Sequence, residues 1–246
     1  MATLKGRERA EYVAGMFARI SQRYDLLNSL MSGGRHHAWR RKALDMASDG
    51  ETSEGLALDL AAGTLDFVLD AARVIPHYSQ WVATDFSAPM LKIGVDKARR
   101  AGVANRIRVA LSDAHALPFR GDSFTLVTVG FGLRNFIDRP TALLEIHRVL
   151  QPGGRLVVLD IVSSRESGVA GRVFGAAFRA VAPVLGLAFA GNRDAYIYLP
   201  ESAAGFTQHG LVRDMVAAGL APIDSRRLAF GAIAIVVGEK GGTKPN

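Results

Sequence analysis

The chain has 246 residues, of which 49% are hydrophobic, and this length predicts one α/β domain with extensions rather than two domains. The absence of cysteine excludes disulfides, cysteine-based zinc sites and iron–sulfur clusters. The net charge of +7 indicates either an attraction to nucleic acid or anionic lipid, or an ordinary basic protein. The N-terminus is charged and has no apolar core, and no run reaches about 18 apolar residues, so we expect a cytoplasmic protein.

Residues 1–54 are predicted to form a helical extension that caps the functional site. Apolar side chains recur on one helical face of this extension, namely Tyr12, Val13, Met16, Phe17 and Ile20. The Gly33–Gly34 pair interrupts the periodicity, and a second helix is expected over residues 39–46. Because these helices precede the first predicted strand, they are additions to the core fold.

Residues 55–246 are predicted to form the main domain, in which short β-rich runs alternate with helical patterns. Such alternation indicates βαβ units and a parallel sheet. Strands are expected at residues 56–60, 81–85, 106–110, 125–130 and 155–161. Helices are expected at about residues 65–74, 88–101 and 139–150, with a short helix in the loop after the third strand.

An apolar insertion over about residues 165–206 precedes the last predicted elements, a helix at 207–219 and strands near 221–228 and 232–238. The tight turn at Phe230–Gly231 requires these two strands to be antiparallel. Five parallel strands closed by an antiparallel hairpin are typical of class I S-adenosylmethionine-dependent methyltransferases. We therefore expect an α/β fold of this class, with a Rossmann-like seven-stranded sheet and N-terminal helices.

Candidate cofactor-binding residues follow three predicted strands, at the edge where ligands bind in open α/β sheets. Asp59 is placed to receive the amino group of the cofactor, and Gly63 allows the backbone to approach it. Asp85 lies 22 residues after Gly63, near the separation expected for a carboxylate that accepts both ribose hydroxyls. Asp113 and Ala114 are expected to frame the adenine, with Asp113 accepting its exocyclic amine. This ordered combination predicts a site for S-adenosylmethionine.

Other functional classes lack their signatures. The G-x-G-x-x-G and Walker A sequences are absent, which counts against a dehydrogenase and a P-loop kinase. No aromatic-interleaved RNA-binding strand, zinc finger or N/D-P-P-Y/F sequence is present, so no nucleic-acid partner is expected. No metal is expected at His36 and His37, because adjacent histidines point apart on a helix and no third ligand is evident. His115 and His147 are predicted to lie at the surface or behind the wall of the site.

The chain resembles the ubiquinone/menaquinone-biosynthesis C-methyltransferases over nearly its whole length. Two segments are specific to that family, YDLLNSLMSGG (24–34) and FGLRNFID (131–138). The segment YIYLPESAAGF (196–206) supports the resemblance, whereas PGGRLVVLD (152–160) is common to many methyltransferases. The resemblance implies C-methylation of a prenylated quinol in respiratory quinone biosynthesis, with S-adenosylmethionine as the cofactor. Demethylmenaquinol is the first expected acceptor, and 2-methoxy-6-polyprenyl-1,4-benzoquinol is the alternative.

The same resemblance implies that Thr64 and Gly130 join Asp85, Asp113 and Ala114 in contacting the cofactor. The family often has serine at the place of Gly130, where a glycine can offer only backbone groups. The family usually has glycine at the place of Leu65, in a GTGD turn. Either this turn keeps a negative φ and Leu65 enters the core, or its side chain partly blocks the pocket. The second alternative would make the chain a non-catalytic binding or assembly protein of the quinone pathway.

Methylation of a ring carbon requires the quinol to lose a hydroxyl proton, so that charge reaches the ortho carbon. The resemblance implies that Arg134 stabilises this oxyanion and orients a water that takes the proton, because arginine is itself a poor base. It also implies that Asn135 and Tyr24 hydrogen-bond the two ring oxygens. Two alternatives stay open: an ion pair between Arg134 and Asp138 across one helical turn, and a core position for Tyr24.

The apolar stretch at residues 168–191 has two interpretations. It is either a buried helix packed on the sheet or a lid over a polyprenyl tail that touches the membrane. The second interpretation predicts peripheral contact with the inner face of the membrane. Homo-oligomerisation is left open.

Overall fold

The computed structural model describes residues 6–48, 55–75, 78, 80–163, 171 and 202–242. The predicted apolar insertion therefore lies outside the described residues apart from Gly171 and its last few positions, and so do both interpretations of residues 168–191. Within the described part of the chain, no helix is long and apolar enough to cross a membrane.

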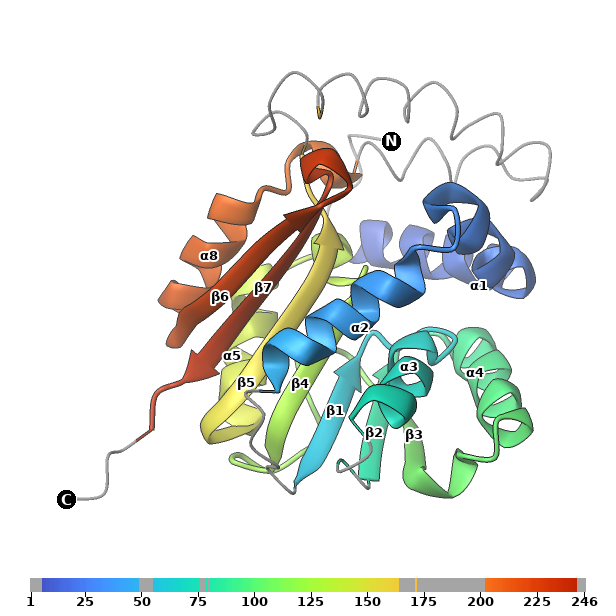
Figure 1. Ribbon diagram of the computed structural model, residues 1–246, viewed down its shortest axis with the longest axis horizontal. Helices are drawn as coiled ribbons and strands as arrows, with labels where there is room; N and C mark the ends of the chain where they lie inside the picture. The colour runs from blue at the N-terminus through green and yellow to red at the C-terminus, as the bar shows by residue number, and fades with distance from the viewer. Residues whose placement is uncertain are drawn as a thin grey trace.

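A seven-stranded sheet forms the centre of the molecule, with the strand order β3-β2-β1-β4-β5-β7-β6 (Figure 1). Its strands are β1 (Leu56–Leu60), β2 (Gln80–Asp85), β3 (Ile107–Leu111), β4 (Phe124–Gly130), β5 (Leu150–Ile161), β6 (Leu220–Leu228) and β7 (Ile233–Lys240). The first five strands run parallel, and β7 pairs antiparallel with both β5 and β6. The predicted class I methyltransferase architecture is confirmed.

Helices cover both faces of this sheet (Figure 1). They are α1 (Gly6–Ser32), α2 (His36–Ala47), α3 (Asp66–Val74), α4 (Ala88–Arg100), α5 (Arg139–Val149) and α8 (Gln208–Ala217). One core lies under α5 and α8, and a second lies under α2, α3 and α4. The central strand β4 is almost entirely buried, because a parallel sheet with helices on both faces must be apolar on both sides.

The N-terminal helix α1 lies beyond the carboxyl ends of the parallel strands and packs against α4 (Figure 1). The side chains of Val13, Met16 and Ile20 from its predicted apolar face are buried. The extension therefore covers the edge of the sheet at which ligands bind in folds of this kind.

The largest difference between a predicted strand and the structure is the start of β5, and one predicted helix is absent. The strand expected to begin at residue 155 begins at Leu150, because Leu150 pairs with Phe124 before a register shift in the ladder. The short helix expected between the third and fourth strands is absent from this fully described loop. The Asp113 carboxylate accepts a hydrogen bond from the His115 N–H at 2.9 Å, and the Ala116 N–H donates to the Asp113 carbonyl at 3.1 Å. Such local bonds give the backbone an alternative to a helix.

Candidate active site

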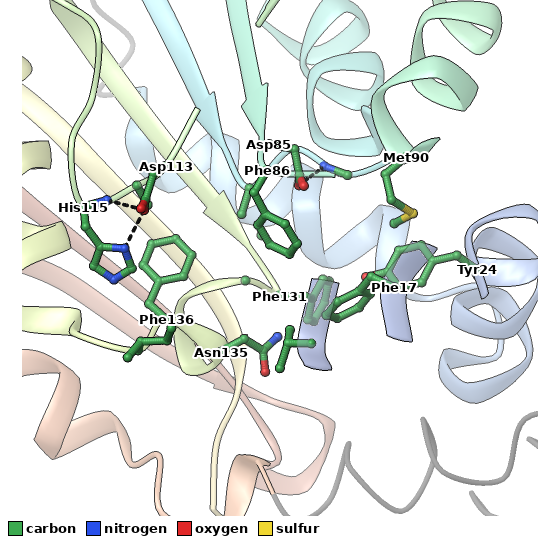
Figure 2. A pocket seen from close by; sticks show the side chains of 17 residues that line it. Phe17, Tyr24, Asp85, Phe86, Met90, Asp113, His115, Phe131, Asn135 and Phe136 are labelled. Carbon is green, nitrogen blue, oxygen red and sulfur yellow. Dashed lines mark hydrogen bonds and ion pairs between the residues drawn. The ribbon is translucent and has the colours of Figure 1, made fainter. Parts of the chain in front are cut away.

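A cavity of about 300 Å³ lies between α1 and the carboxyl ends of β1 to β4. Five aromatic side chains line it: Phe17, Tyr24, Phe86, Phe131 and Phe136. Figure 2 shows Asp113 and His115 at one end of this cavity and Phe17 and Tyr24 at the other. The first end therefore carries a carboxylate, with Phe136 beside His115, and the second end is lined by aromatic side chains.

A second cavity of about 30 Å³ adjoins the first below the turn that follows β1. Nine of the ten predicted site residues line one cavity or both: Tyr24, Asp59, Gly63, Thr64, Asp85, Asp113, Ala114, Gly130 and Asn135. Arg134 lines neither. The topology thus gathers residues from five separate segments of the chain at one place.

Asp85 ends β2 and is 7% exposed. Its Oδ2 accepts a hydrogen bond from the Gly63 N–H at 2.9 Å, and its Oδ1 accepts one from the Ser87 N–H at 2.8 Å. Burial raises the pKa of this carboxyl, against the effect of these backbone hydrogen bonds. A carboxylate oxygen has more than one acceptor position, so both oxygens can still accept ribose hydroxyls from the cavity.

Asp59 is 1% exposed in β1 and lines the smaller cavity. Its Oδ1 accepts a hydrogen bond from the Thr128 hydroxyl at 2.7 Å. Its Oδ2 is buried and has no hydrogen-bond partner among the described residues. Because buried polar atoms are nearly always paired, this oxygen fits the ammonium group of a bound ligand. Burial raises the pKa of Asp59 to about 7.

We expect cofactor affinity to rise with pH through this titration. An ammonium group binds the ionised form of Asp59, and the ionised fraction grows as the pH passes about 7. S-adenosylhomocysteine binding measured by calorimetry from about pH 6 to about pH 7.5, where an α-amino group is still largely protonated, should therefore tighten. Asp59→Asn should remove this pH dependence. An affinity that is equally pH-dependent in the variant would contradict the role of Asp59.

Asp113 and His115 form a pair at the polar end of the large cavity. The His115 Nδ1 lies 2.6 Å from the Asp113 Oδ1, and the His115 Nε2 accepts the Asp138 N–H at 3.2 Å. Burial tends to raise the pKa of Asp113, but the backbone and side-chain hydrogen bonds from His115 outweigh it, and the pKa is lowered. Sequence reasoning missed His115 as a residue of the cavity wall. Its position two residues after Asp113 was the available signal.

Gly130 ends β4 next to Phe67 of α3. A Cβ at this position would meet the Phe67 ring, so a serine could be placed here only if that ring moved. The next residue, Phe131, has a φ of 59° although it is not glycine. Backbone strain of this kind is common where a wall must be held in one shape around a ligand.

The turn at Leu65 differs from both predicted alternatives. The expected negative φ is wrong, since Leu65 adopts the left-handed conformation with φ 63° and ψ 19°. Its side chain is nevertheless fully buried in the core, beside Gly94 of α4, where a Cβ would collide with it. Leu65 lines neither cavity, so its side chain does not block either one. The strain of about 1–2 kcal/mol is offset by burial of a leucine side chain, about 1.5–3 kcal/mol.

Leu65→Gly should therefore destabilise the fold without weakening cofactor binding. Loss of the buried side chain costs about 2–5 kcal/mol, and relief of the left-handed strain returns about 1–2 kcal/mol. We expect urea unfolding to show a net loss of about 1–3 kcal/mol. Calorimetry should show an S-adenosylhomocysteine affinity close to that of the unmodified chain. A clear gain in affinity would mean that Leu65 obstructs the pocket.

Tyr24 of α1 lines both cavities, so its position is not that of an ordinary core residue. Its ring makes an edge contact with Phe17 at 5.9 Å between centroids. Burial raises the pKa of the Tyr24 hydroxyl, while a hydrogen bond from Asn28 and the positive charges of Arg134 and Arg40 oppose the rise. The hydroxyl is therefore protonated at neutral pH and can donate a hydrogen bond into the cavity.

Arg134 is 3% exposed and lies behind the cavity wall. Its Nη1 donates to the Asp160 carboxylate and to the Phe131 carbonyl, both at 2.5 Å. The alternative ion pair with Asp138 is wrong: Asp138 caps α5 by accepting the Thr141 N–H at 3.1 Å. Through these bonds Arg134 holds the strained backbone of Phe131. Of the two predicted neighbours Arg134 and Asn135, only Asn135 lines the cavity.

His36 and His37 begin α2, three residues before the predicted start of this helix, and the expectation that they point apart is wrong. Their ring centroids are 4.1 Å apart at the N-terminus of α2. His36 pairs with Arg40 at 2.9 Å, and His37 pairs with Asp70 at 2.9 Å. Burial, followed by the charge of Arg40, lowers the pKa of His36 to about 4. Among the described residues, no group of three or more His, Asp or Glu side chains is arranged to hold a metal ion.

The fold and the carboxylates at its strand ends define a class I S-adenosylmethionine-dependent methyltransferase. The chain belongs to the ubiE/COQ5 methyltransferase family, whose sequence model matches residues 5–240. It is 43% identical to the demethylmenaquinone methyltransferase of Thermus thermophilus, covering 92% of this chain and all of the relative. It is 39% identical to the ubiquinone/menaquinone biosynthesis C-methyltransferase UbiE of Geobacter sulfurreducens, covering 95% of this chain and 90% of the relative.

Solved structures show the same fold at low sequence identity. A S-adenosylmethionine-dependent methyltransferase from Aquifex aeolicus superposes with a TM-score of 0.60 at 14% identity, covering 88% of this chain and 97% of that one. A geranyl diphosphate C-methyltransferase from Streptomyces coelicolor, solved with S-adenosyl-L-homocysteine, gives a TM-score of 0.59 at 14% identity. That match covers 82% of this chain and 77% of the other.

Proposed function

We propose that the protein methylates a ring carbon of a prenylated quinol, with demethylmenaquinol as the acceptor and S-adenosylmethionine as the methyl donor. The observation that carries this proposal is a cavity that is lined by the carboxylates of Asp85 and Asp113 and that has an aromatic wall at the end where Phe17 and Tyr24 lie. The names of the two relatives above support the reaction class. The relative with 43% identity and full coverage favours the naphthoquinol ring over the benzoquinol ring.

The residues present fit the cofactor. Asp85 would hold the ribose hydroxyls, Asp113 and Ala114 the adenine, and the unpaired Oδ2 of Asp59 the ammonium group. When bound, S-adenosylmethionine supplies an electrophilic methyl group. Gly63 allows close approach of the backbone because it has no Cβ, and its N–H donates to Asp85.

Four residues of this chain would bind and orient the quinol. Phe17 and Phe131 line the cavity and offer flat apolar surfaces on which an aromatic ring can stack. The Asn135 side chain and the Tyr24 hydroxyl would hydrogen-bond the ring oxygens and so fix the ring's orientation. As the ring hydroxyl loses its proton to a water, the buried guanidinium of Arg134 stabilises the developing negative charge from behind the wall.

Activity against two acceptors, measured side by side, tests the proposal. Short-chain demethylmenaquinol and 2-methoxy-6-polyprenyl-1,4-benzoquinol analogues should be incubated with radiolabelled S-adenosylmethionine under reducing conditions. We expect the naphthoquinol to accept the methyl group at the higher kcat/KM. Faster turnover of the benzoquinol would reverse the assignment of the ring. Absence of both cofactor binding and methylation would favour the non-catalytic binding or assembly protein instead.

We further propose that the protein works at the surface of an anionic membrane. The net charge of +7 and the apolar tail of the proposed acceptor support this location. The protein should float with vesicles that contain anionic phospholipid at low salt and should be released at about 1 M salt, where charges are screened within roughly 3 Å. Equal behaviour with neutral vesicles would contradict an electrostatic attachment.

A further inference from the structure

The turn after β1 is held by three different elements through three consecutive residues. The Gly63 N–H donates to Asp85 at the end of β2, and the Leu65 side chain packs beside Gly94 of α4. Between them, the Thr64 hydroxyl donates to the Asp25 Oδ1 of α1 at 2.6 Å. Thr64 was expected to contact the cofactor, but its hydroxyl is directed to the helix that covers the site. The turn is therefore connected to the N-terminal extension.

Lys97 of α4 completes this connection. Its ammonium group donates to the Asp25 Oδ2 at 2.6 Å, to the Thr64 hydroxyl at 3.3 Å and to Asp66. These three bonds use all of its N–H donors. Asp66 in turn accepts from Arg40 of α2 at 2.9 Å. One cluster thus joins α1, α2, α3 and α4 directly beside the cofactor turn.

Asp25 occupies a particular place in this cluster, because it is the member contributed by α1. It follows Tyr24, which lines both cavities, and α1 also carries Phe17 on the aromatic wall. Thr64 is 2% exposed, so its hydroxyl and the Asp25 carboxylate meet at the inner side of α1. These contacts link the turn directly to the helix that shapes the acceptor end.

We propose that Asp25 is a positioning residue that couples cofactor binding at the turn to the placement of α1 over the acceptor end of the cavity. A ligand whose amino acid end rests on Gly63 and Thr64 restricts the turn, and the Thr64 hydroxyl then holds Asp25 and α1 more firmly. Coupling between two sites is reciprocal, so the cofactor also raises affinity for an acceptor that contacts Tyr24. This inference rests on the proposed function for the identity of both ligands.

Limited proteolysis tests the coupling without any acceptor. Arg19 and Arg23 lie exposed on α1, so trypsin cleavage after them, followed by mass spectrometry, reports on the placement of this helix. Saturating S-adenosylhomocysteine should slow cleavage at these two sites by about five-fold or more in the unmodified chain, the lower end of usual coupling factors. In Asp25→Asn the protection should be lost while calorimetry still shows saturation by S-adenosylhomocysteine. Unprotected wild-type α1, or full protection in Asp25→Asn, overturns the proposal.

Further variants separate positioning from a general loss of structure. Thr64→Val should also lose the protection, whereas Thr64→Ser, which keeps the hydroxyl, should retain it. Asp96→Asn is the matched control, because it breaks an exposed ion pair with Arg99 on the same helix α4 and leaves the cluster intact. Protection that survives in Thr64→Val, or disappears in Asp96→Asn, also overturns the proposal.

A binding experiment then links the coupling to the acceptor. The probe is a 1,4-naphthoquinone with one prenyl unit, titrated in the presence and absence of S-adenosylhomocysteine. Its affinity should rise about five-fold or more with S-adenosylhomocysteine in the unmodified chain and should not change in Asp25→Asn. An equal rise in both chains contradicts the inference. If no quinol is methylated but α1 is still protected, the proposed function fails and the coupling stands. If a quinol is methylated but α1 is not protected, the proposed function stands and the coupling fails.

Discussion

Asp85→Ala is expected to weaken S-adenosylhomocysteine binding by roughly 10- to 150-fold. This range corresponds to about 1.5–3 kcal/mol, the usual contribution of hydrogen bonds to a charged group. The variant loses the proposed acceptor for both ribose hydroxyls, and it also leaves the N–H groups of Gly63 and Ser87 without their acceptor. The second loss loosens the turn on which the other end of the cofactor would rest. Isothermal calorimetry gives the affinity directly.

Two controls make the Asp85 result specific. Asp224→Ala removes an exposed aspartate on β6, at the opposite edge of the sheet, and should leave the affinity unchanged. Thermal unfolding of Asp85→Ala without ligand shows how much of the effect is loss of fold. An affinity equal to that of the unmodified chain would rule out a ribose contact for Asp85.

Substitution of Arg134 is expected to have the largest effect on stability. Arg134→Met leaves the carboxylate of Asp160, which is 1% exposed, without its cation. Breaking a buried ion pair by removing one partner typically costs about 3–5 kcal/mol. Urea unfolding should show a loss of this size. Turnover per folded molecule should also fall, because the Phe131 carbonyl loses its donor and the wall beside Asn135 loses its shape.

A double-mutant cycle separates the two roles of Arg134. Asp160→Asn combined with Arg134→Met removes both charges, so the double variant should recover part of the lost stability. Turnover should not recover with it if the guanidinium charge acts on the acceptor. Recovery of both quantities would show that Arg134 only supports the fold, and additive losses of stability would contradict the ion pair.

The class of fold and most of the candidate cofactor site could be predicted from the sequence. Alternating strands and helices, and a hairpin closed at Phe230–Gly231, are local patterns that survive folding unchanged. Asp59, Asp85 and Asp113 could be placed together because the carboxyl ends of parallel strands must share one edge of the sheet. The acceptor residues followed from family resemblance, since nothing in their spacing brings α1 to the end of β4.

The contacts of several of these residues could not be predicted from the sequence. One of the two alternatives gave Leu65 a negative φ, yet the residue adopts a left-handed turn, and Gly94, distant in sequence, leaves room for its side chain in the core. Arg134 points to Asp160 on β5 rather than to Asp138 nearby, because a buried guanidinium requires a buried carboxylate. The bond from Thr64 to Asp25 joins residues 39 positions apart. Sequence patterns report local periodicity and strand ends, whereas side-chain partners depend on which helices the folded chain brings together.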